Sequence, residues 1–140
     1  MQVKVKKLDP KAVIPKYAKV GDAGLDLTAT SYDYSNGRHV YGTGLAIEIP
    51  KGYVGLLFPR SSICKMDLRL TNCVGVIDSG YRGQISLFFE NDGMEDPLIY
   101  KVGDRIGQLL ILAYRQIEMQ EVGELSDTVR GESGFGSTGI

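Results

Sequence analysis

The sequence has a single histidine, two cysteines and no tryptophan among its 140 residues. One histidine gives poor support to a zinc site or to a histidine-based catalytic triad. His39 lies in a polar stretch, where we expect a surface side chain rather than a ligand. Cys64 and Cys73 indicate no disulfide framework, and we expect them to be reduced, buried thiols.

Long apolar runs and an excess of one charge are also missing. No run approaches ~20 apolar residues, so no segment is expected to span a membrane. The N-terminal stretch MQVKVKKLDP lacks the apolar core of a signal peptide. This favours a cytoplasmic protein, or one of the host cytoplasm or nucleus if the source is viral. With 16 basic and 17 acidic residues, the net charge of −1 gives no general attraction for nucleic acid or anionic membranes.

Glycines and short alternating segments dominate the chain instead. The 18 glycines are spread along its whole length. Between them, apolar and polar residues alternate at 25–29, 45–49 and 85–89. Such alternation, with frequent turn signals, is typical of strands in a sandwich or barrel. We therefore expect one all-β domain, with a turn or two of helix at 61–66.

The final eleven residues, RGESGFGSTGI, cannot form a core alone. They contain a G-x-G-x-x-G match, but a dinucleotide fold needs a helix and an acidic residue after it, and one residue follows here. The segment is either a disordered tail or a flexible flap that orders on a ligand. As a flap, its N–H groups, hydroxyls and Arg130 would wrap an anion, and Phe135 would stack on a base.

Two further stretches admit both a structural and a functional interpretation. FPRSSI, at 58–63, is either a helix start or a phosphate site made of unpaired N–H groups and Arg60. DAGLDL, at 22–27, places Asp26 on a strand face that is either solvated or a site for a hydrated cation.

VGDRIGQLL, at 102–110, is interpreted as a turn that enters a strand. Asp104 and Arg105 form a possible surface pair of little energetic value. Gln108 stands in an apolar stretch, so it is either a core hydrogen bonder or a ligand contact.

GVIDSGYRGQI, at 75–85, predicts two apolar strands joined by a tight hairpin over Ser79 and Gly80. Asp78 and Tyr81 flank the reversal. On its local pattern alone this hairpin is structure, because aspartate and glycine favour turns for backbone reasons.

In this order, AGLDL, PRSSI, GVIDSGYRGQI, GDRIGQLL and RGESGFGSTG closely resemble the five motifs of the trimeric deoxyuridine triphosphatases (dUTPases). The resemblance runs from Ala23 to Gly139. It departs from the family pattern at Gly107, where alanine is frequent, and at Ser133, where glycine is frequent. It implies a jelly-roll-like β-barrel of the β-clip type that assembles as a homotrimer, often with exchanged C-terminal segments.

The resemblance also implies how the chain is divided. Residues 1–129 would form the barrel, and residues 130–140 a flexible flap that completes the active site of a neighbouring subunit. One subunit would supply the first, second and fourth motifs, a second the hairpin with Asp78, and a third the tail.

The implied reaction is hydrolysis of dUTP to dUMP and pyrophosphate, which keeps uracil out of DNA and supplies dUMP for dTMP synthesis. Asp78 is the implied general base, which would deprotonate a water for attack on the α-phosphorus. Tyr81 would lie under the deoxyribose and leave no partner for a 2′-hydroxyl, whose unpaired burial costs roughly 1–3 kcal/mol. Mg²⁺ would be held mainly by the substrate phosphates, with Asp26 binding its waters.

The other implied substrate contacts fall into two groups. The phosphate contacts are Arg60, Ser61, Ser62, Gln108, Arg130, Gly136, Ser137 and Thr138. The contacts to uracil are Asn72, the backbone of Gly75, Val76 and Ile77, and the ring of Phe135.

Three rival functions remain. A dCTP deaminase shares the fold and several motifs, but it needs a proton shuttle for attack on the base ring, and Asp78 with the following GYRG fits the triphosphatase pattern better. A nucleotide-sensing or protein-regulating relative without turnover should show a damaged motif, and all five are intact. A purely structural jelly roll explains the strands but not the motifs.

Overall fold

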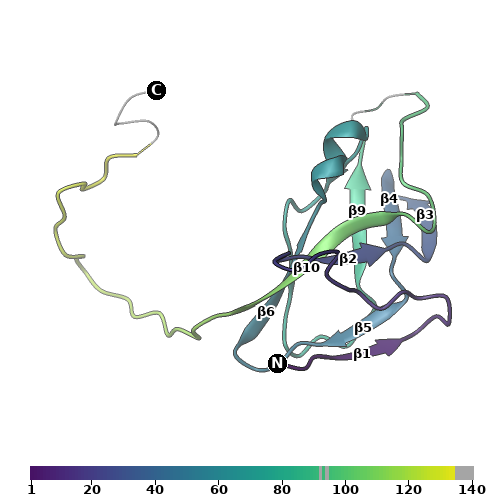
Figure 1. The fold of residues 1–140 in the computed structure, drawn as a ribbon. Helices are drawn as coiled ribbons and strands as arrows, with labels where there is room; N and C mark the ends of the chain where they lie inside the picture. The colour runs from purple at the N-terminus through teal and green to yellow at the C-terminus, as the bar shows by residue number, and fades with distance from the viewer. Residues whose placement is uncertain (92, 94, 135–140) are drawn as a thin grey trace.

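The computed structural model describes residues 1–91, 93 and 95–134. Within these residues, ten strands form three antiparallel sheets (Figure 1). The two-stranded sheet pairs β1 (Lys4–Lys7) with β5 (Leu45–Glu48). The strands of the second sheet are, in order, β2 (Leu25–Thr28), β10 (Arg105–Ala113), β6 (Tyr53–Phe58) and β8 (Gly75–Ile77). Those of the third are β3 (Ser31–Ser35), β4 (Arg38–Gly42), β9 (Ser86–Glu90) and β7 (Arg69–Leu70).

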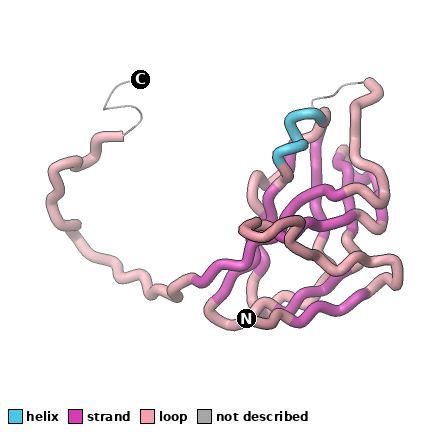
Figure 2. The backbone as a smooth tube through the Cα atoms, viewed as in Figure 1, coloured by secondary structure: helices cyan, strands magenta, loops and turns pink. Residues whose placement is uncertain are grey.

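One short helix follows β6 in the described part of the chain. It is η1 (Ser61–Lys65), a 3-10 turn drawn in cyan in Figure 2. Arg60 precedes it in an extended conformation, and no side chain caps its start. The expected helical turn at 61–66 is confirmed. Over residues 1–91, 93 and 95–134, no helix has the length and apolar character needed to cross a membrane.

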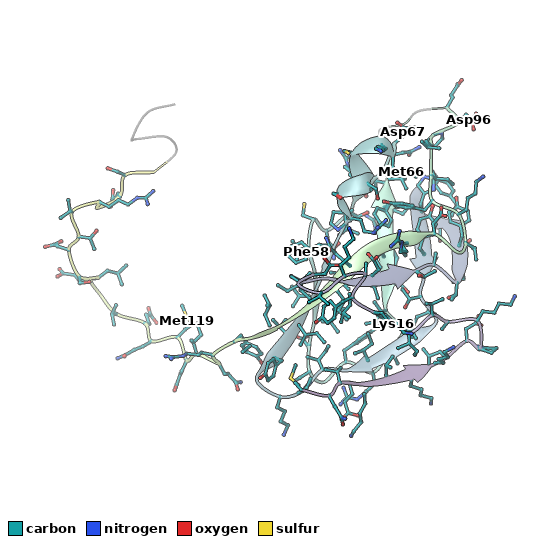
Figure 3. The ribbon with its side chains drawn as sticks, in the orientation of Figure 1. Lys16, Phe58, Met66, Asp67, Asp96 and Met119 are labelled. Carbon is teal, nitrogen blue, oxygen red and sulfur yellow. The ribbon has the colours of Figure 1, made fainter. Side chains whose placement is uncertain are left out.

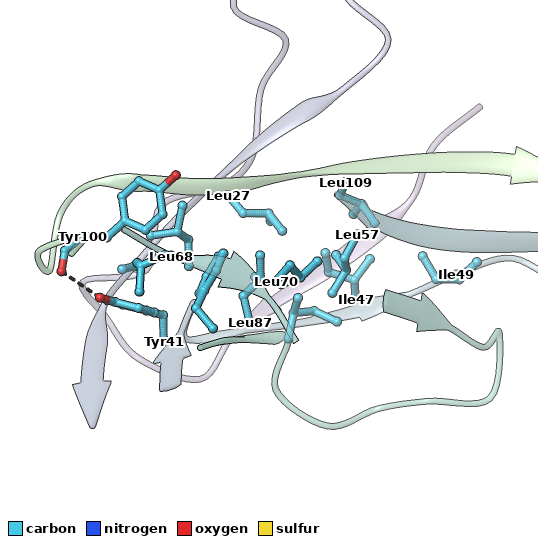
Figure 4. Packing of buried hydrophobic residues seen from close by; sticks show 14 residues of the cluster. Leu27, Tyr41, Ile47, Ile49, Leu57, Leu68, Leu70, Leu87, Tyr100 and Leu109 are labelled. Atoms are coloured by element: carbon cyan, nitrogen blue, oxygen red, sulfur yellow. Dashed lines mark hydrogen bonds between the residues drawn. The ribbon is translucent and has the colours of Figure 1, made fainter. Parts of the chain in front are cut away.

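Buried side chains from all three sheets meet in one core, which confirms the all-β expectation (Figure 4). Alternation along β9 shows the pattern, since Leu87 and Phe89 are buried while Phe88 between them is exposed. At one end of the core the Tyr41 hydroxyl donates to the Tyr100 carbonyl at 2.9 Å, which satisfies a polar group away from water. The sheets share this jelly-roll core without hydrogen bonds that close them into one barrel among the described strands.

The stretch GVIDSGYRGQI is not a two-stranded hairpin. β8 pairs with β6, with Val76 opposite Leu56, whereas β9 pairs with β4 and β7. Residues 78–85 therefore carry the chain from one sheet to the other. The expected turn is present, because the Tyr81 N–H donates to the Asp78 carbonyl at 3.1 Å. The apolar run at 75–77 and the alternation at 85–89 predicted both strands correctly, but neither pattern identified the strand partners.

The predicted burial or exposure of three side chains was wrong. Cys64 and Cys73 are free but exposed, because one lies in η1 and the other in a turn rather than on a core-facing strand position. His39 is only 5% exposed, because β4 lies between β3 and β9 and turns this side chain inward.

After β10 the chain leaves the body of the molecule. Residues 114–134 run away from the sheets, and Met119 is labelled on this stretch in Figure 3. Its apolar side chains are uncovered, with Ile117 74%, Met119 85% and Leu125 87% exposed. We call residues 114–134 the C-terminal arm. Within the single chain described, the arm buries none of these side chains.

Candidate functional site

An open cleft of about 610 Å³ lies where β2, β10 and the end of β6 meet. Strand register brings its polar residues together, because Gln108 on β10 is paired with Asp26 on β2 and with Phe58 on β6. Arg60 and Ser61 follow β6 and line the same cleft. Residues from the first, second and fourth motifs therefore line the same cleft. The full lining is Ala18, Asp22, Ala23, Gly24, Asp26, Phe58, Pro59, Arg60, Ser61, Arg105, Gln108 and Leu110.

The Asp26 carboxylate lies between two arginines. Its Oδ1 accepts from Arg60 Nε at 2.9 Å, and its Oδ2 accepts from Arg105 Nη1 at 2.9 Å. Arg60 also donates from Nη1 to Ser62 Oγ at 3.4 Å. Asp26 thus orients two planar guanidinium groups, whose remaining N–H donors suit phosphate oxygens.

Arg105 is a cleft residue that sequence reasoning missed. It was interpreted as the partner of Asp104, but Asp104 accepts from the Lys101 N–H instead. The strand pairing between β10 and β2 is irregular between Arg105 and Gly107. Such a bulge changes the direction of a side chain, and the sequence carries no clear signal of it.

Gln108 is fixed by two close contacts. Its Nε2 donates to the Pro59 carbonyl at 3.2 Å. A β-carbon on Gly24 would lie 2.2 Å from Gln108 Oε1, so only glycine leaves room for this amide. The amide oxygen and the arginines consequently face the same cleft.

A second, smaller hollow lies beside β8. It has a volume of about 270 Å³ and is lined by Val76, Ile77, Asp78, Tyr81, Gln84, Ser86 and Phe88. Asp78 is exposed, and the Tyr81 hydroxyl donates to the Gln84 carbonyl at 3.0 Å. Among the described strands β8 is the edge of its sheet, so part of its backbone has no strand partner.

The remaining predicted site residues lie around this hollow or away from it. Gly75 is buried on β8, where a β-carbon would contact Leu57 at 3.0 Å. Asn72 is exposed in the turn before β8. The two hollows share no lining residue in the part of the chain that the structure describes. In a single chain, the cleft that contains Arg60 and Arg105, which we call the arginine cleft, is therefore separate from the loop that contains Asp78.

Among the predicted tail residues that the structure describes, Arg130 is brought to neither hollow. Arg130 is exposed on the C-terminal arm, and its Nε donates to the Ser133 carbonyl at 3.0 Å. Phe135, Gly136, Ser137 and Thr138 lie outside the described residues.

The side chains of this cleft suit a magnesium ion that is held through its waters rather than by direct protein ligands. Over residues 1–91, 93 and 95–134, no three His, Cys, Asp or Glu side chains gather as a metal cage. Both oxygens of Asp26 accept from arginine, but each carboxylate oxygen has a second lone pair for a water. Mg²⁺ keeps much of its hydration shell and often uses one carboxylate plus substrate phosphates, which this cleft can accommodate.

One buried tyrosine lies close to Arg60 and Ser62 but does not line the arginine cleft. Tyr100 is 5% exposed, and burial raises the pKa of its phenol, so it stays a neutral hydroxyl. Its Oη has no hydrogen-bond partner among the described residues.

Comparison with known protein families gives one match over most of the chain. The family model described as dUTPase matches residues 10–139. A deoxyuridine 5′-triphosphate nucleotidohydrolase of Corynebacterium glutamicum is 44% identical over 140 residues, covering 98% of this chain and 94% of the relative. The protein of the same name from Crocosphaera subtropica is 41% identical, with full coverage of both chains.

Solved structures agree with this match. The dUTPase of Staphylococcus bacteriophage 80alpha, solved with the dUTP analogue dUpNHpp, superposes with a TM-score of 0.84 at 30% identity and covers 99% of each chain. A mutant dUTPase from phage phi11 of S. aureus, described as coordinating a structural Mg(II) ion, has a TM-score of 0.73 at 25% identity. It covers 89% of this chain and 98% of its own.

Proposed function

The chain belongs to the dUTPase family, and from this premise we propose how its residues hydrolyse dUTP to dUMP and pyrophosphate. The observation that carries the proposal is the pair of arginines oriented by Asp26, in a cleft that also holds Gln108 and Ser61. This cleft is assigned to the triphosphate. Arg60, Ser61, Ser62 and Gln108 supply its donors.

The loop with Asp78 is assigned to the nucleoside and to the attacking water. The unpaired edge of β8, at Gly75–Ile77, and the nearby Asn72 offer hydrogen bonds to the uracil ring. Backbone groups have fixed positions, so the inverted donor and acceptor pattern of cytosine does not match. Asp78 is the general base that takes a proton from the water as it attacks the α-phosphorus. Tyr81, held at its hydroxyl by Gln84, packs against the deoxyribose.

The charge of the cleft supports a site that draws on more than one chain. Its charged lining residues are Asp22, Asp26, Arg60 and Arg105, which cancel at neutral pH. A triphosphate carries several negative charges, so further cations are needed. Mg²⁺ would neutralise part of the phosphate charge, with Asp26 holding its waters. Arg130 of another subunit would supply the rest.

The separation of the two hollows supports a homotrimer with shared sites. The C-terminal arm carries five acidic and two basic residues, a net charge of −3, together with its uncovered apolar side chains. A groove of about 400 Å³ beside β1 has complementary chemistry, with Lys4, Lys6 and Arg82 against a single Glu48, around apolar Val5, Leu8, Ala46 and Ile47. The arm of a second copy can cover this groove and so bring its tail to a neighbouring site.

Residues 130–140 are proposed as the flap that closes over the bound nucleotide. Phe135 would stack on uracil, and Arg130, Gly136, Ser137 and Thr138 would wrap the phosphates. Closure excludes bulk water and completes the set of donors.

The function is tested by incubating the protein with Mg²⁺ and, separately, dUTP, dCTP, dTTP or UTP. Pyrophosphate and dUMP from dUTP alone are expected. Ammonia from dCTP would favour a deaminase, and dUTP binding without turnover would favour a nucleotide sensor. Sedimentation should give three times the 15.3 kDa chain mass, and a monomer would contradict the shared site.

A further inference from the structure

The segment that bears Asp78 and Tyr81 has little to hold it in place. Residues 78–85 belong to no strand. Their last two residues are held, because the Gly44 N–H donates to Gln84 Oε1 and the Ile85 N–H donates to the Leu45 carbonyl, whereas residues 78–83 make no backbone hydrogen bond to the described strands of either sheet. One backbone hydrogen bond, from the Tyr81 N–H to the Asp78 carbonyl, closes the turn. A β-carbon on Gly80 would meet no atom within 4 Å, so the apex of the turn is not supported by packing.

Arg82 supplies the missing support. Its Nη1 donates to the Ser79 carbonyl at 2.7 Å and to the Tyr81 carbonyl at 2.9 Å. These two carbonyls lie on either side of Gly80, so one guanidinium nitrogen ties both arms of the turn. Hydrogen bonds from a charged donor are roughly twice as strong as neutral ones. In the part of the chain that is described, Arg82 has no carboxylate partner that would draw it away.

We infer that Arg82 is a positioning residue for hydrolysis, which fixes the turn that carries Asp78 and Tyr81 without itself touching the substrate. The inference rests on the proposed function, in which Asp78 is the base and Tyr81 the sugar contact. A displacement of about 1 Å in a reacting group can cost on the order of 10²-fold in rate. Tyr81 has a second tie, from its hydroxyl to the Gln84 carbonyl, so loss of Arg82 should displace Asp78 most and Tyr81 to a smaller extent.

A competing role for Arg82 is visible in the same structure. Its side chain also lines the groove beside β1, together with Lys4 and Lys6. If Arg82 mainly holds the acidic arm of another subunit, its removal should weaken assembly and leave the chemistry of each intact trimer unchanged. The two roles are separated by measuring mass and turnover on the same sample.

The test is Arg82→Met, which removes the donors and keeps an unbranched stem. The expected result is a loss of about 10²-fold in kcat for dUTP with KM changed by less than about threefold, because binding contacts outside the turn remain. The ratio of kcat/KM for dUTP over UTP should fall by a smaller factor than kcat, since Tyr81 keeps its hydrogen bond to the Gln84 carbonyl. Trimer mass and Tm should stay at wild-type values. Arg38→Met is the matched control, because Arg38 bonds Glu90 at the end of β9 that is remote from residues 78–85.

Wild-type kcat and selectivity in Arg82→Met would overturn the inference, and so would a loss of turnover that only follows a loss of trimer. If Arg82→Met does not fold, Arg82→Lys decides. The lysine ammonium is one bond closer to Cα than Nη1 of arginine, so Arg82→Lys should give an intermediate kcat. A wild-type kcat in Arg82→Lys would overturn the positioning role. Absence of pyrophosphate from the wild-type enzyme would instead overturn the proposed function, and the role of Arg82 with it.

Discussion

The ring of Tyr81 lies directly against the backbone of Gly83. A β-carbon on Gly83 would approach the Tyr81 hydroxyl oxygen to 2.4 Å and the ring carbon beside it to 2.5 Å. The hydroxyl also donates to the Gln84 carbonyl at 3.0 Å. The position of this ring, which we assign to the deoxyribose, therefore depends on a glycine two residues away.

Gly83→Ala is expected to push the Tyr81 ring aside and to relax selection against a 2′-hydroxyl. The ratio of kcat/KM for dUTP over UTP should fall by up to the roughly five- to 150-fold that corresponds to about 1–3 kcal/mol. Gly80→Ala in the same loop is the control, because its β-carbon meets no atom within 4 Å. An unchanged ratio in Gly83→Ala would remove Tyr81 as the selecting group.

Asp78→Asn tests the base directly. The amide keeps the shape of the side chain but cannot take a proton from water, so kcat should fall by roughly 10²–10⁴-fold. Affinity for dUTP, measured by calorimetry, should stay within a few fold. Near-normal turnover would assign the base to another group.

Removal of residues 130–140 tests the flap. Residues 130–133 are exposed, and their hydrogen bonds stay within the C-terminal arm, so the trimer should keep its mass and Tm. Catalysis should fall sharply, since the cleft lacks the cations and closure that the tail provides. Full activity after truncation would exclude the flap role. If activity is lost as expected, Arg130→Met shows how much of the loss comes from charge.

Gly107→Ala tests a departure from the family pattern. A β-carbon at Gly107 would lie 2.4 Å from Leu87 Cδ2 and 3.0 Å from the Phe58 carbonyl. Leu87 is 1% exposed and has no free space to move into, so the substitution should cost about 1–3 kcal/mol of unfolding free energy. Leu87→Val removes the clashing atom, and in that background Gly107→Ala should cost less. Equal losses of unfolding free energy in both backgrounds would mean that the core accommodates the added methyl group by moving atoms other than Leu87 Cδ2.

His39 should make stability depend on pH. Burial lowers its pKa from the ordinary 6.5, and Nε2 has no partner among the described residues. Tyr32 shares a hydrogen bond with Nδ1, and Tyr34 packs on the ring, so the β3 side chains that contact His39 carry no charge. Asp33, the charged residue between them, alternates to the other face of the strand. The unfolded chain then binds the proton more readily than the folded one. Stability is complete above pH 6.5 and declines as the pH falls through it.

This decline is measured as Tm between pH 7.5 and 5.5, above the main titration of carboxylates. His39 is the single histidine, so His39→Gln should flatten the profile in this window. A slope that persists in His39→Gln would assign the effect to other groups.

The sequence predicted the strands better than it predicted their neighbours. Alternation at 85–89 identifies β9, and three of the five motifs contain Asp26, Arg60, Ser61 and Gln108, which the structure brings to one cleft. Pairing is a long-range property, so nothing local showed that β8 joins β6 rather than β9. The bulge that turns Arg105 toward Asp26 was hidden for the same reason.

One local signal was present but unused. Asn36 and Gly37 both have positive φ, 51° and 75°, and they connect β3 to β4. Asn-Gly between alternating residues is the strongest short hairpin signal. It would have placed His39 inside a paired strand, although its burial also needed β9 on the other side.

The separation of the arginine cleft from the Asp78 loop has a genetic consequence. In the proposed trimer, a chain with Asp78 substituted lacks a working Asp78 loop, and a chain with Arg60 substituted lacks a working arginine cleft. Mixed subunits can then reunite two undamaged halves, in about one site in four for equal, random mixing around a three-fold axis. Two inactive alleles of this protein would complement each other, whereas two alleles with lesions in the same half would not.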